Sequence, residues 1–257
     1  MSSARLCLIS SAIAVILVLS GPAQAERGQL GNVIVSLNGG IFPRELPRNH
    51  RAPVSVRLAG RVLTADQSPL PRVNWIRLEL AWRGRLETKG LTSCPRARLE
   101  SAESRLALQR CGDALVGRGQ LFAQVFVPNQ DAFDVRARAL AFNGVTKEGR
   151  HAVLIHAYST RPPASFVIPF AVHYNKGRTV LITTIRRSLG PWPRVANFQI
   201  SVARTFEHDG AKRSYLSASC PVPKGFTAGF LSWARATYTF EGGKQITTES
   251  VRSCRAR

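Results

Sequence analysis

The stretch Asn74–Trp82, NWIRLELAW, alternates apolar and polar side chains and decides the fold class of the chain. The two sets are Ile76, Leu78, Leu80 and Trp82 on one side, and Arg77 and Glu79 on the other. Successive side chains of an extended strand point to opposite faces. The stretch therefore predicts a β-strand with one buried face and one solvated face.

The same period of two recurs along most of the chain. Pro53–Arg61 repeats it, with Val54, Val56 and Leu58 opposed by Ser55, Arg57 and Arg61. Further strand-like runs lie near residues 32–37, 119–128, 133–142, 152–159, 165–174, 179–185, 195–207, 212–219, 231–240 and 245–252. Because Gly, Pro, Asn or Asp separates many of these runs, we predict an all-β protein with an antiparallel β-sandwich-like body.

One interval, residues 98–111, departs from this pattern. It mixes Leu, Ala, Glu, Arg and Gln without a β-branched residue, and Leu99, Leu106 and Cys111 recur at roughly helical intervals. Ser101 is a suitable N-cap and Gly112 a suitable stop. We predict one short helix, tethered by a disulfide and packed over the end of the sheets, rather than a recognition element.

The first 25 residues have the pattern of a cleavable export signal. Arg5 precedes an apolar run, Leu6–Leu19, and Ala23-Gln24-Ala25 supplies a small-x-small cleavage site. No later stretch approaches the roughly 18 apolar residues that a membrane-spanning helix needs. We therefore predict a signal peptide at 1–25, a processed chain at 26–257 without a transmembrane helix, and a secreted or cell-envelope location.

Four cysteines remain after this cleavage, namely Cys94, Cys111, Cys220 and Cys254. An even number in an oxidising compartment predicts two disulfides, for which three pairings are possible. The pairing that is local in sequence, Cys94 with Cys111 and Cys220 with Cys254, is the favoured one. No Cys-x-x-Cys pair with partner histidines occurs, so we predict neither a metal site nor a cofactor.

The processed chain has no segment that resembles a disordered linker, and we treat 26–257 as one all-β domain. If there are two domains, the loop at 161–164, which contains Arg161-Pro162-Pro163, is the preferred boundary.

The chain is strongly basic, with 36 Lys and Arg against 15 Asp and Glu, a formal net charge of +21. Removal of the leader discards only Arg5 and leaves +20. Such an excess attracts anionic partners. Export places intracellular nucleic acid out of reach, which leaves anionic envelope polymers, lipid headgroups or stray extracellular nucleic acid. The alternative is that the excess reflects base composition and solubility, since 30 of the 36 basic residues are arginine.

Five arginines are the anion-binding candidates because they alternate with apolar neighbours in strand-like runs: Arg57, Arg61, Arg77, Arg136 and Arg138. If their strands adjoin in one sheet, their guanidinium groups form a planar array suited to phosphate or carboxylate. Trp75 is the aromatic residue closest to them in sequence. The alternative is an ordinary solvated sheet face.

Catalytic motifs are missing from the sequence, which has no Gly-x-Ser-x-Gly elbow and no His-Glu-x-x-His. Gly117-Arg118-Gly119 is interpreted as a turn at the start of a strand. His151 and His156 are expected on opposite faces of one strand, whereas His156 and His173 could meet across a hairpin; partly exposed, neutral imidazoles are the favoured interpretation. His208 beside Asp209 is explained by local hydrogen bonding in a turn.

Several short segments together carry a resemblance: Phe42–Arg48, Lys89-Gly90-Leu91 before Cys94-Pro95, Cys111 with Ala114–Gly117, Ser165–Phe170, Cys220–Phe226 and Ser253-Cys254. On these residues the processed chain resembles a family of uncharacterised exported bacterial proteins. The resemblance implies export and the same four cysteines, and it implies no activity.

These observations predict a non-catalytic envelope or extracellular binding or structural protein with affinity for anionic polymers. The alternative is a hydrolase that acts on an envelope polymer through a site assembled from distant residues. An enzyme needs an enclosed pocket where polar groups with perturbed pKa values converge, whereas a binding protein needs only a broad positive surface.

Thiol titration tests the export and disulfide predictions together. Protein exported from its native host, denatured without reductant, is expected to show none of the four cysteines of 26–257 as free thiols, because an oxidising compartment pairs them. Recovery of four free thiols would contradict both predictions.

Overall fold

The computed structural model describes residues 26–81 and 83–257 of the chain. The predicted export signal and the inward position predicted for Trp82 lie outside the described residues.

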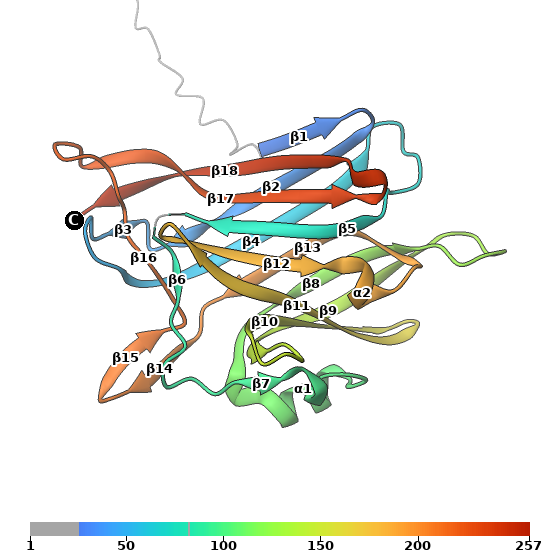
Figure 1. Ribbon diagram of the computed structural model, residues 1–257, viewed down its shortest axis with the longest axis horizontal. Coiled ribbons are helices and arrows are strands. Elements are labelled where there is room, and N and C mark those ends of the chain that lie inside the picture. Colours follow the sequence, from blue (N-terminus) through green and yellow to red (C-terminus); the bar gives the residue numbers. More distant parts are fainter. Residues whose placement is uncertain (1–25, 82) are drawn as a thin grey trace, which may run out of the picture.

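The described chain consists mostly of strands (Figure 1). They are β1 Glu26–Leu30, β2 Val33–Phe42, β3 Glu45–Leu46, β4 Ala52–Thr64, β5 Val73–Leu80, β6 Arg85–Leu86, β7 Cys94–Pro95, β8 Leu115–Val125, β9 Phe133–Val145, β10 His151–Thr160, β11 Pro163–Asn175, β12 Arg178–Thr184, β13 Pro193–Val202, β14 Thr205–His208, β15 Ala211–Ser214, β16 Leu216–Ala218, β17 Ala228–Phe240 and β18 Gln245–Ala256. The helices are α1 Ser104–Cys111 and α2 Ile185–Leu189, with 3-10 turns at Arg96–Arg98, Gly112–Ala114 and Glu241–Gly243.

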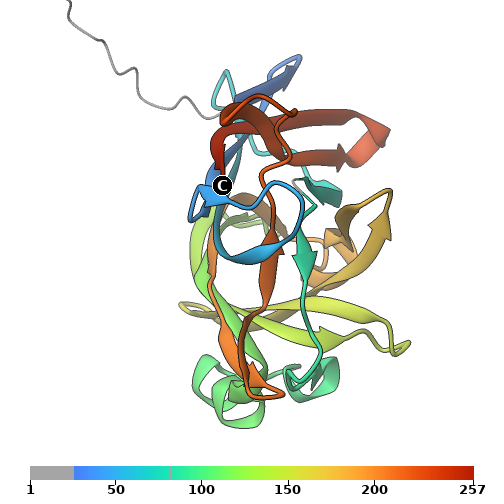
Figure 2. The same cartoon turned by 90° about the vertical axis from the view of Figure 1, so that its left-hand side faces the viewer.

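The prediction of a largely β, mainly antiparallel protein is confirmed, but the sandwich is wrong. One sheet runs in the order β1-β2-β4-β13-β8-β9-β10-β11-β12-β5-β17-β18-β3, and only the β14–β15 hairpin stands apart from it. This sheet curls strongly into a half-barrel (Figures 1 and 2). Period-two alternation predicts that one face of each strand is buried, but it does not distinguish a second sheet from the far wall of the same sheet.

The last long strand returns to the first two and contacts them through side chains. Thr248 Oγ1 donates to the carbonyl oxygen of Glu26 at 2.8 Å, and the Val251 amide donates to the Glu26 carboxylate at 2.6 Å. Arg252 Nε donates to the carbonyl oxygen of Gly39 at 2.7 Å. Gly28 permits this approach, because a Cβ there would lie 2.7 Å from the Thr247 carbonyl oxygen.

Two small elements fill the ends of the curled sheet. At one end β16 pairs with β4 and with β6. The short strands β6 and β16 cross the opening in the end-on view (Figure 2). At the other end α2, which was not predicted, buries Ile185 and Leu189. The core between them comes from inward residues of both walls, such as Leu58, Leu78 and Ile168.

The predicted short helix is present but begins later than expected. The α-helical turns start at Ser104 with Glu103 as N-cap, whereas Ser101 has a positive φ of 58° and cannot cap them. Gly112 is the C-cap, as predicted. Ala107 and Cys111 pack with Phe142 and Leu154 on the outer face of β9 and β10, as expected of a packed element.

Both disulfides form with the predicted local pairing. Cys94 bonds to Cys111 with a Cα–Cα distance of 5.7 Å, and Cys220 bonds to Cys254 with a Cα–Cα distance of 5.8 Å. The first bond anchors the helical excursion to the sheet, and the second joins the segment after β16 to β18. Two disulfides indicate an oxidising, extracytoplasmic setting.

The alternative domain boundary at 161–164 falls in a β-hairpin. Thr160 of β10 pairs with Pro163 of β11, and the sheet continues on both sides of them. Within the part of the chain that the structure describes, no helix has the length and apolar character needed to span a membrane.

Removal of either disulfide is expected to destabilise the protein, and removal of the one that closes the longer loop is expected to do so somewhat more. The sequence separations are 17 and 34 residues, for which chain entropy predicts losses of about 3 and about 4 kcal/mol in the free energy of unfolding. Urea unfolding of Cys94→Ala/Cys111→Ala and Cys220→Ala/Cys254→Ala measures them. Equal stability of either double variant and the parent protein would refute this account.

Candidate functional site

Strand pairing brings basic and amide side chains into rows on the outer side of the half-barrel. Arg61 on β4 pairs with Asn197 on β13, Asn197 pairs with Phe122 on β8, and Phe122 pairs with Arg136 on β9. On the other side of Arg61, the row continues through Ser36 on β2 to Arg27 on β1. The outward positions of six strands thus form one continuous row.

Two neighbouring rows have the same character. One runs from Gln199 through Gln120 to Arg138, and the other from Arg57 through Ser201 to Arg118. We call the exposed set formed by Arg27, Arg57, Arg61, Arg118, Arg136 and Arg138 the arginine face.

Four of the five predicted arginines belong to this face, but their strands do not all adjoin. β13 and β8 lie between β4 and β9, which separates the Arg61 and Arg136 backbones by about 14 Å at about 4.8 Å per strand. The sheet is also curved there. The expected planar array is therefore replaced by a convex one in which amide side chains lie between the guanidinium groups.

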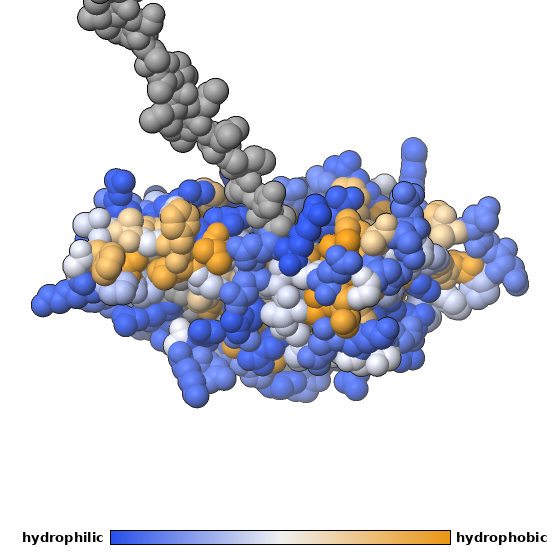
Figure 3. Space-filling view, turned by 90° about the horizontal axis from the view of Figure 1, so that it is seen from above, coloured by the Kyte–Doolittle hydropathy of each residue, from blue (hydrophilic) through white to orange (hydrophobic). Residues whose placement is uncertain are grey.

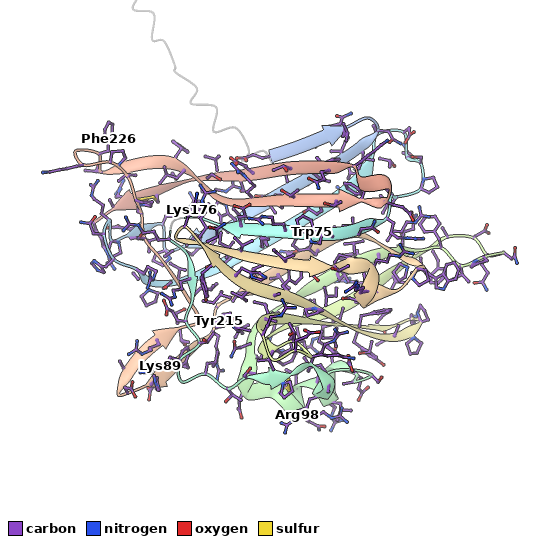
Figure 4. All side chains as sticks on the ribbon, in the orientation of Figure 1. Trp75, Lys89, Arg98, Lys176, Tyr215 and Phe226 are labelled. Carbon is purple, nitrogen blue, oxygen red and sulfur yellow. A yellow bond between two sulfur atoms is a disulfide. The ribbon has the colours of Figure 1, made fainter. Side chains whose placement is uncertain are left out.

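Arg77 lies elsewhere, on β5. Trp75, which belongs to the same strand, is labelled in Figure 4. Arg77 Nε donates to Glu79 at 2.8 Å, and Arg178 lies 3.6 Å from the same carboxylate. The hydrogen bond from Arg77 is the main cause that holds the pKa of Glu79 below its ordinary value. Because its charge is compensated and its strand is distant, Arg77 is not part of the arginine face.

Two surface hollows meet at Arg61 and Asn197, which line both. One of about 490 Å³ extends towards Phe122 and Asp134, and the other of about 310 Å³ extends towards Arg27. Each is open to solvent and lined by polar and apolar side chains. The arginine face thus has a concave site on either side of the Arg61 guanidinium group.

The charge of this wall is almost entirely positive. Strands β1, β2, β4, β8, β9 and β13 contain two carboxylates, Glu26 and Asp134, and seven arginines: Arg27, Arg57, Arg61, Arg118, Arg136, Arg138 and Arg194. The Glu26 carboxylate accepts a hydrogen bond from the Val251 amide of β18. Among residues 26–81 and 83–257, no member of the arginine face forms an ion pair, whereas Arg77 and Arg235 on the other wall are paired with Glu79 and Glu249.

Neutral neighbours orient two of these guanidinium groups. Arg136 donates to Gln120 Oε1 at 2.7 Å and lies 5.4 Å from the centre of the Phe122 ring. Arg57 lies 5.7 Å from the centre of the Phe42 ring. These contacts hold the side chains without neutralising them, which leaves their charge available to an anion.

Sequence reasoning missed Arg27, Arg118, Asn197 and Phe122. Arg118 was missed because Gly117-Arg118-Gly119 was interpreted as a turn, whereas this tripeptide lies inside β8. A Cβ at Gly119 would lie 1.9 Å from the Gln199 carbonyl oxygen, so the glycine serves the close approach of β8 and β13. Leu121 and Ala123 point inward, and the alternation of side chains along the strand then predicts that Arg118 points outward. This signal could have identified Arg118.

The face viewed from above in Figure 3 is different in character. Seen over β1, β17 and β18, hydrophilic residues surround separate apolar areas. The most exposed large apolar side chains of the described chain are Phe230 and Phe226, 80% and 62% exposed. Phe226 lies in the loop before β17 (Figure 4).

Strand register keeps the histidines of β10 and β11 apart. His156 pairs in register with Val167 and His173 with Val180, so the two do not meet across the hairpin. No group of metal-ligating side chains occurs in the described ranges. His208 Nε2 lies 3.2 Å from Asp209, as expected for a local pair.

His156 is completely buried beneath α1, which corrects the expectation that it is partly exposed. Its Nε2 lies 2.8 Å from the Ala102 carbonyl oxygen and 3.3 Å from Ser165 Oγ. A carbonyl oxygen only accepts, so Nε2 carries the proton and is unable to act as a base toward Ser165. Burial lowers the pKa of His156, which keeps the ring neutral.

No protein-family model, curated protein or solved structure matches the chain. The resemblance to exported proteins therefore depends on the segments quoted for it, and the pairing of all four cysteines agrees with what it implies.

The burial of His156 predicts a pH dependence of stability. Its native pKa lies below the unfolded value of 6.5, so below about pH 6.5 the unfolded chain binds a proton that the native chain does not. The free energy of unfolding is therefore expected to fall as the pH decreases from 7 towards 5. Urea titrations across this range measure it.

His156→Gln keeps a hydrogen-bond donor for the Ala102 carbonyl and removes the imidazole that titrates. The free energy of unfolding of this variant is therefore expected to fall less between pH 7 and pH 5 than that of the parent protein. His50→Gln, at an exposed histidine, is the matched control and should follow the parent protein. Identical pH dependence in the parent protein and His156→Gln would rule out this role of the imidazole.

Proposed function

We propose that the protein is a non-catalytic, exported binding protein of the cell envelope whose arginine face holds anionic polymers. The observation that carries the proposal is the set of six exposed arginines without ion-pair partners in the described chain, arranged around two hollows. Uncompensated guanidinium groups bind phosphate and carboxylate, often through two parallel hydrogen bonds.

The spacing of the arginines favours a repeating ligand. The groups lie in three parallel rows, and the ends of the Arg61–Arg136 segment are about 14 Å apart at about 4.8 Å per strand. One small anion contacts only part of such a surface. A polymer with repeated negative charges reaches several guanidinium groups together, and the amides of Asn197, Gln199 and Gln120 offer hydrogen bonds between them.

Binding is better supported than hydrolysis of an envelope polymer. The six strands of the row contain two carboxylates, and one of them, Glu26, accepts a hydrogen bond from the Val251 amide of β18 rather than facing Asp134. The face thus does not present the two facing carboxyl groups of a glycosidase. The Ser165–His156 contact lacks a free base because the ring nitrogen nearest Ser165 holds its proton for Ala102. Within the described chain, neither the arginine face nor the Ser165–His156 contact thus offers geometry that favours the hydrolase alternative.

An extracytoplasmic location agrees with the two disulfides and with the charge. The net charge of +20 on residues 26–257 draws anionic envelope material towards the protein over a distance that shrinks as salt rises. Lipid headgroups present the same anionic chemistry on a surface rather than along a chain.

Binding of fluorescent dextran sulfate, a soluble polyanion, tests the proposal. Arg61→Gln/Arg136→Gln removes two charges beside the larger hollow and is expected to weaken binding about 2- to 30-fold, since each exposed ionic contact contributes about 0.2–1 kcal/mol. Binding by the parent protein should also weaken steeply between 50 and 300 mM NaCl because these charges are screened.

Arg77→Gln/Arg235→Gln is the matched control, since it removes the same charge from the opposite wall, where both arginines are paired. Its affinity should stay close to that of the parent protein. Equal weakening by both double variants would show that net charge alone drives binding, and salt-independent or absent binding would refute the proposal.

A further inference from the structure

The interior of the half-barrel is not completely filled by its own side chains. A cavity of about 120 Å³ lies between the two walls, lined by inward residues of both, such as Leu58, Leu78, Val153 and Ile168. Protein interiors are normally close-packed, and an apolar cavity of about 150 Å³ is large enough to take up benzene. The space is therefore sufficient for an apolar group.

The surface of this cavity is entirely apolar. Apart from Tyr215, every lining residue is aliphatic or phenylalanine. Tyr215, labelled in Figure 4 between β15 and β16, is 1% exposed and lines the cavity with apolar atoms only. The cavity therefore suits the hydrocarbon part of a ligand and offers it no hydrogen bond.

A second apolar pocket adjoins this cavity at the end that α2 occupies. It has a volume of about 230 Å³ and shares Leu121 with the interior cavity. Helix α2 contributes to both spaces, with Ile185 in the inner one and Leu189 in the outer one. Trp192, 44% exposed, lines the outer pocket and reaches solvent.

The two spaces follow one strand. On β11, Ala164 and Phe166 line the outer pocket, and Ile168 and Phe170 line the inner cavity. This inward track spans about 20 Å at about 3.3 Å per residue. Half of a bilayer's hydrocarbon core is about 15 Å thick, so the track is long enough for one acyl chain.

Positive charge flanks the outer pocket. Arg161 lies between the lining residues Ser159 and Pro162, and Arg186 and Arg187 occupy the exposed side of α2 between Ile185 and Leu189. No carboxylate lines the pocket, and within the described residues none of these three arginines forms an ion pair. An apolar pocket with cations beside it matches an amphiphile that has a negative head.

We infer that the half-barrel binds a single-chain anionic amphiphile. The acyl chain enters beside Trp192, occupies the outer pocket and extends past Leu121 into the interior cavity, while its anionic head stays with Arg161, Arg186 and Arg187. This site lies inside the sheet and is separate from the arginine face on its outer surface.

Displacement of the fluorescent probe N-phenyl-1-naphthylamine by dodecanoate, and by dodecyltrimethylammonium with the same chain and the opposite charge, tests the inference. At 50 mM NaCl, dodecanoate is expected to bind at least tenfold more tightly than the cation. Arg186→Gln/Arg187→Gln should reduce this preference and leave the affinity for the neutral probe unchanged. Equal affinity of the two amphiphiles would overturn the assignment of the head.

Ala164→Phe places a ring in the track at a partly exposed position and is expected to weaken dodecanoate binding at least tenfold. Ala211→Phe makes the same change on the exposed β15 and should bind as the parent protein does. Dodecanoate binding should also shift the emission of Trp192 to shorter wavelength, a change that Trp192→Phe abolishes.

If Ala164→Phe and Ala211→Phe both bind dodecanoate like the parent protein, the acyl chain is bound elsewhere and the inference fails. It fails equally if dodecanoate does not displace the probe or if the emission shift persists in Trp192→Phe. Arg61→Gln/Arg136→Gln should retain dodecanoate binding, so this result and the polyanion result remain distinguishable.

Discussion

The return of β18 to β1 and β2 is the contact on which the rest of the structure depends. It draws the two ends of one long sheet together through Thr248, Val251 and Arg252, and the carbonyl and carboxylate of Glu26 accept two of the resulting hydrogen bonds. A flat sheet of this pattern would leave its apolar face in water. Curling turns that face inward and makes a core from a single layer.

The same curvature separates two kinds of surface chemistry. On the outside of β4, β13, β8 and β9, arginines alternate with buried residues and find amides and aromatic rings as neighbours rather than carboxylates. On the outside of β5 and β17, arginines face Glu79 and Glu249. One wall therefore keeps its positive charge, whereas the other neutralises it.

The short elements complete what the long strands leave open. β6 and β16 cross one end, and α2 fills the other. α1 covers apolar residues on the outer side of β9 and β10, and His156 is buried beside them. The disulfides anchor the irregular segments to the sheet, Cys94–Cys111 around α1 and Cys220–Cys254 after β16. The remaining interior space is enclosed by apolar surface.

Local alternation and local spacing were enough to predict most of the long strands, the short helix, the favoured cysteine pairing and the outward direction of Arg57, Arg61, Arg136 and Arg138. They were not enough to predict that the strands form one curled sheet, that Arg118 joins the arginine face and Arg77 does not, or that His156 is buried. Strand order depends on pairing between distant segments, such as β4 with β13 and β5 with β17, and a period of two is the same for every possible partner.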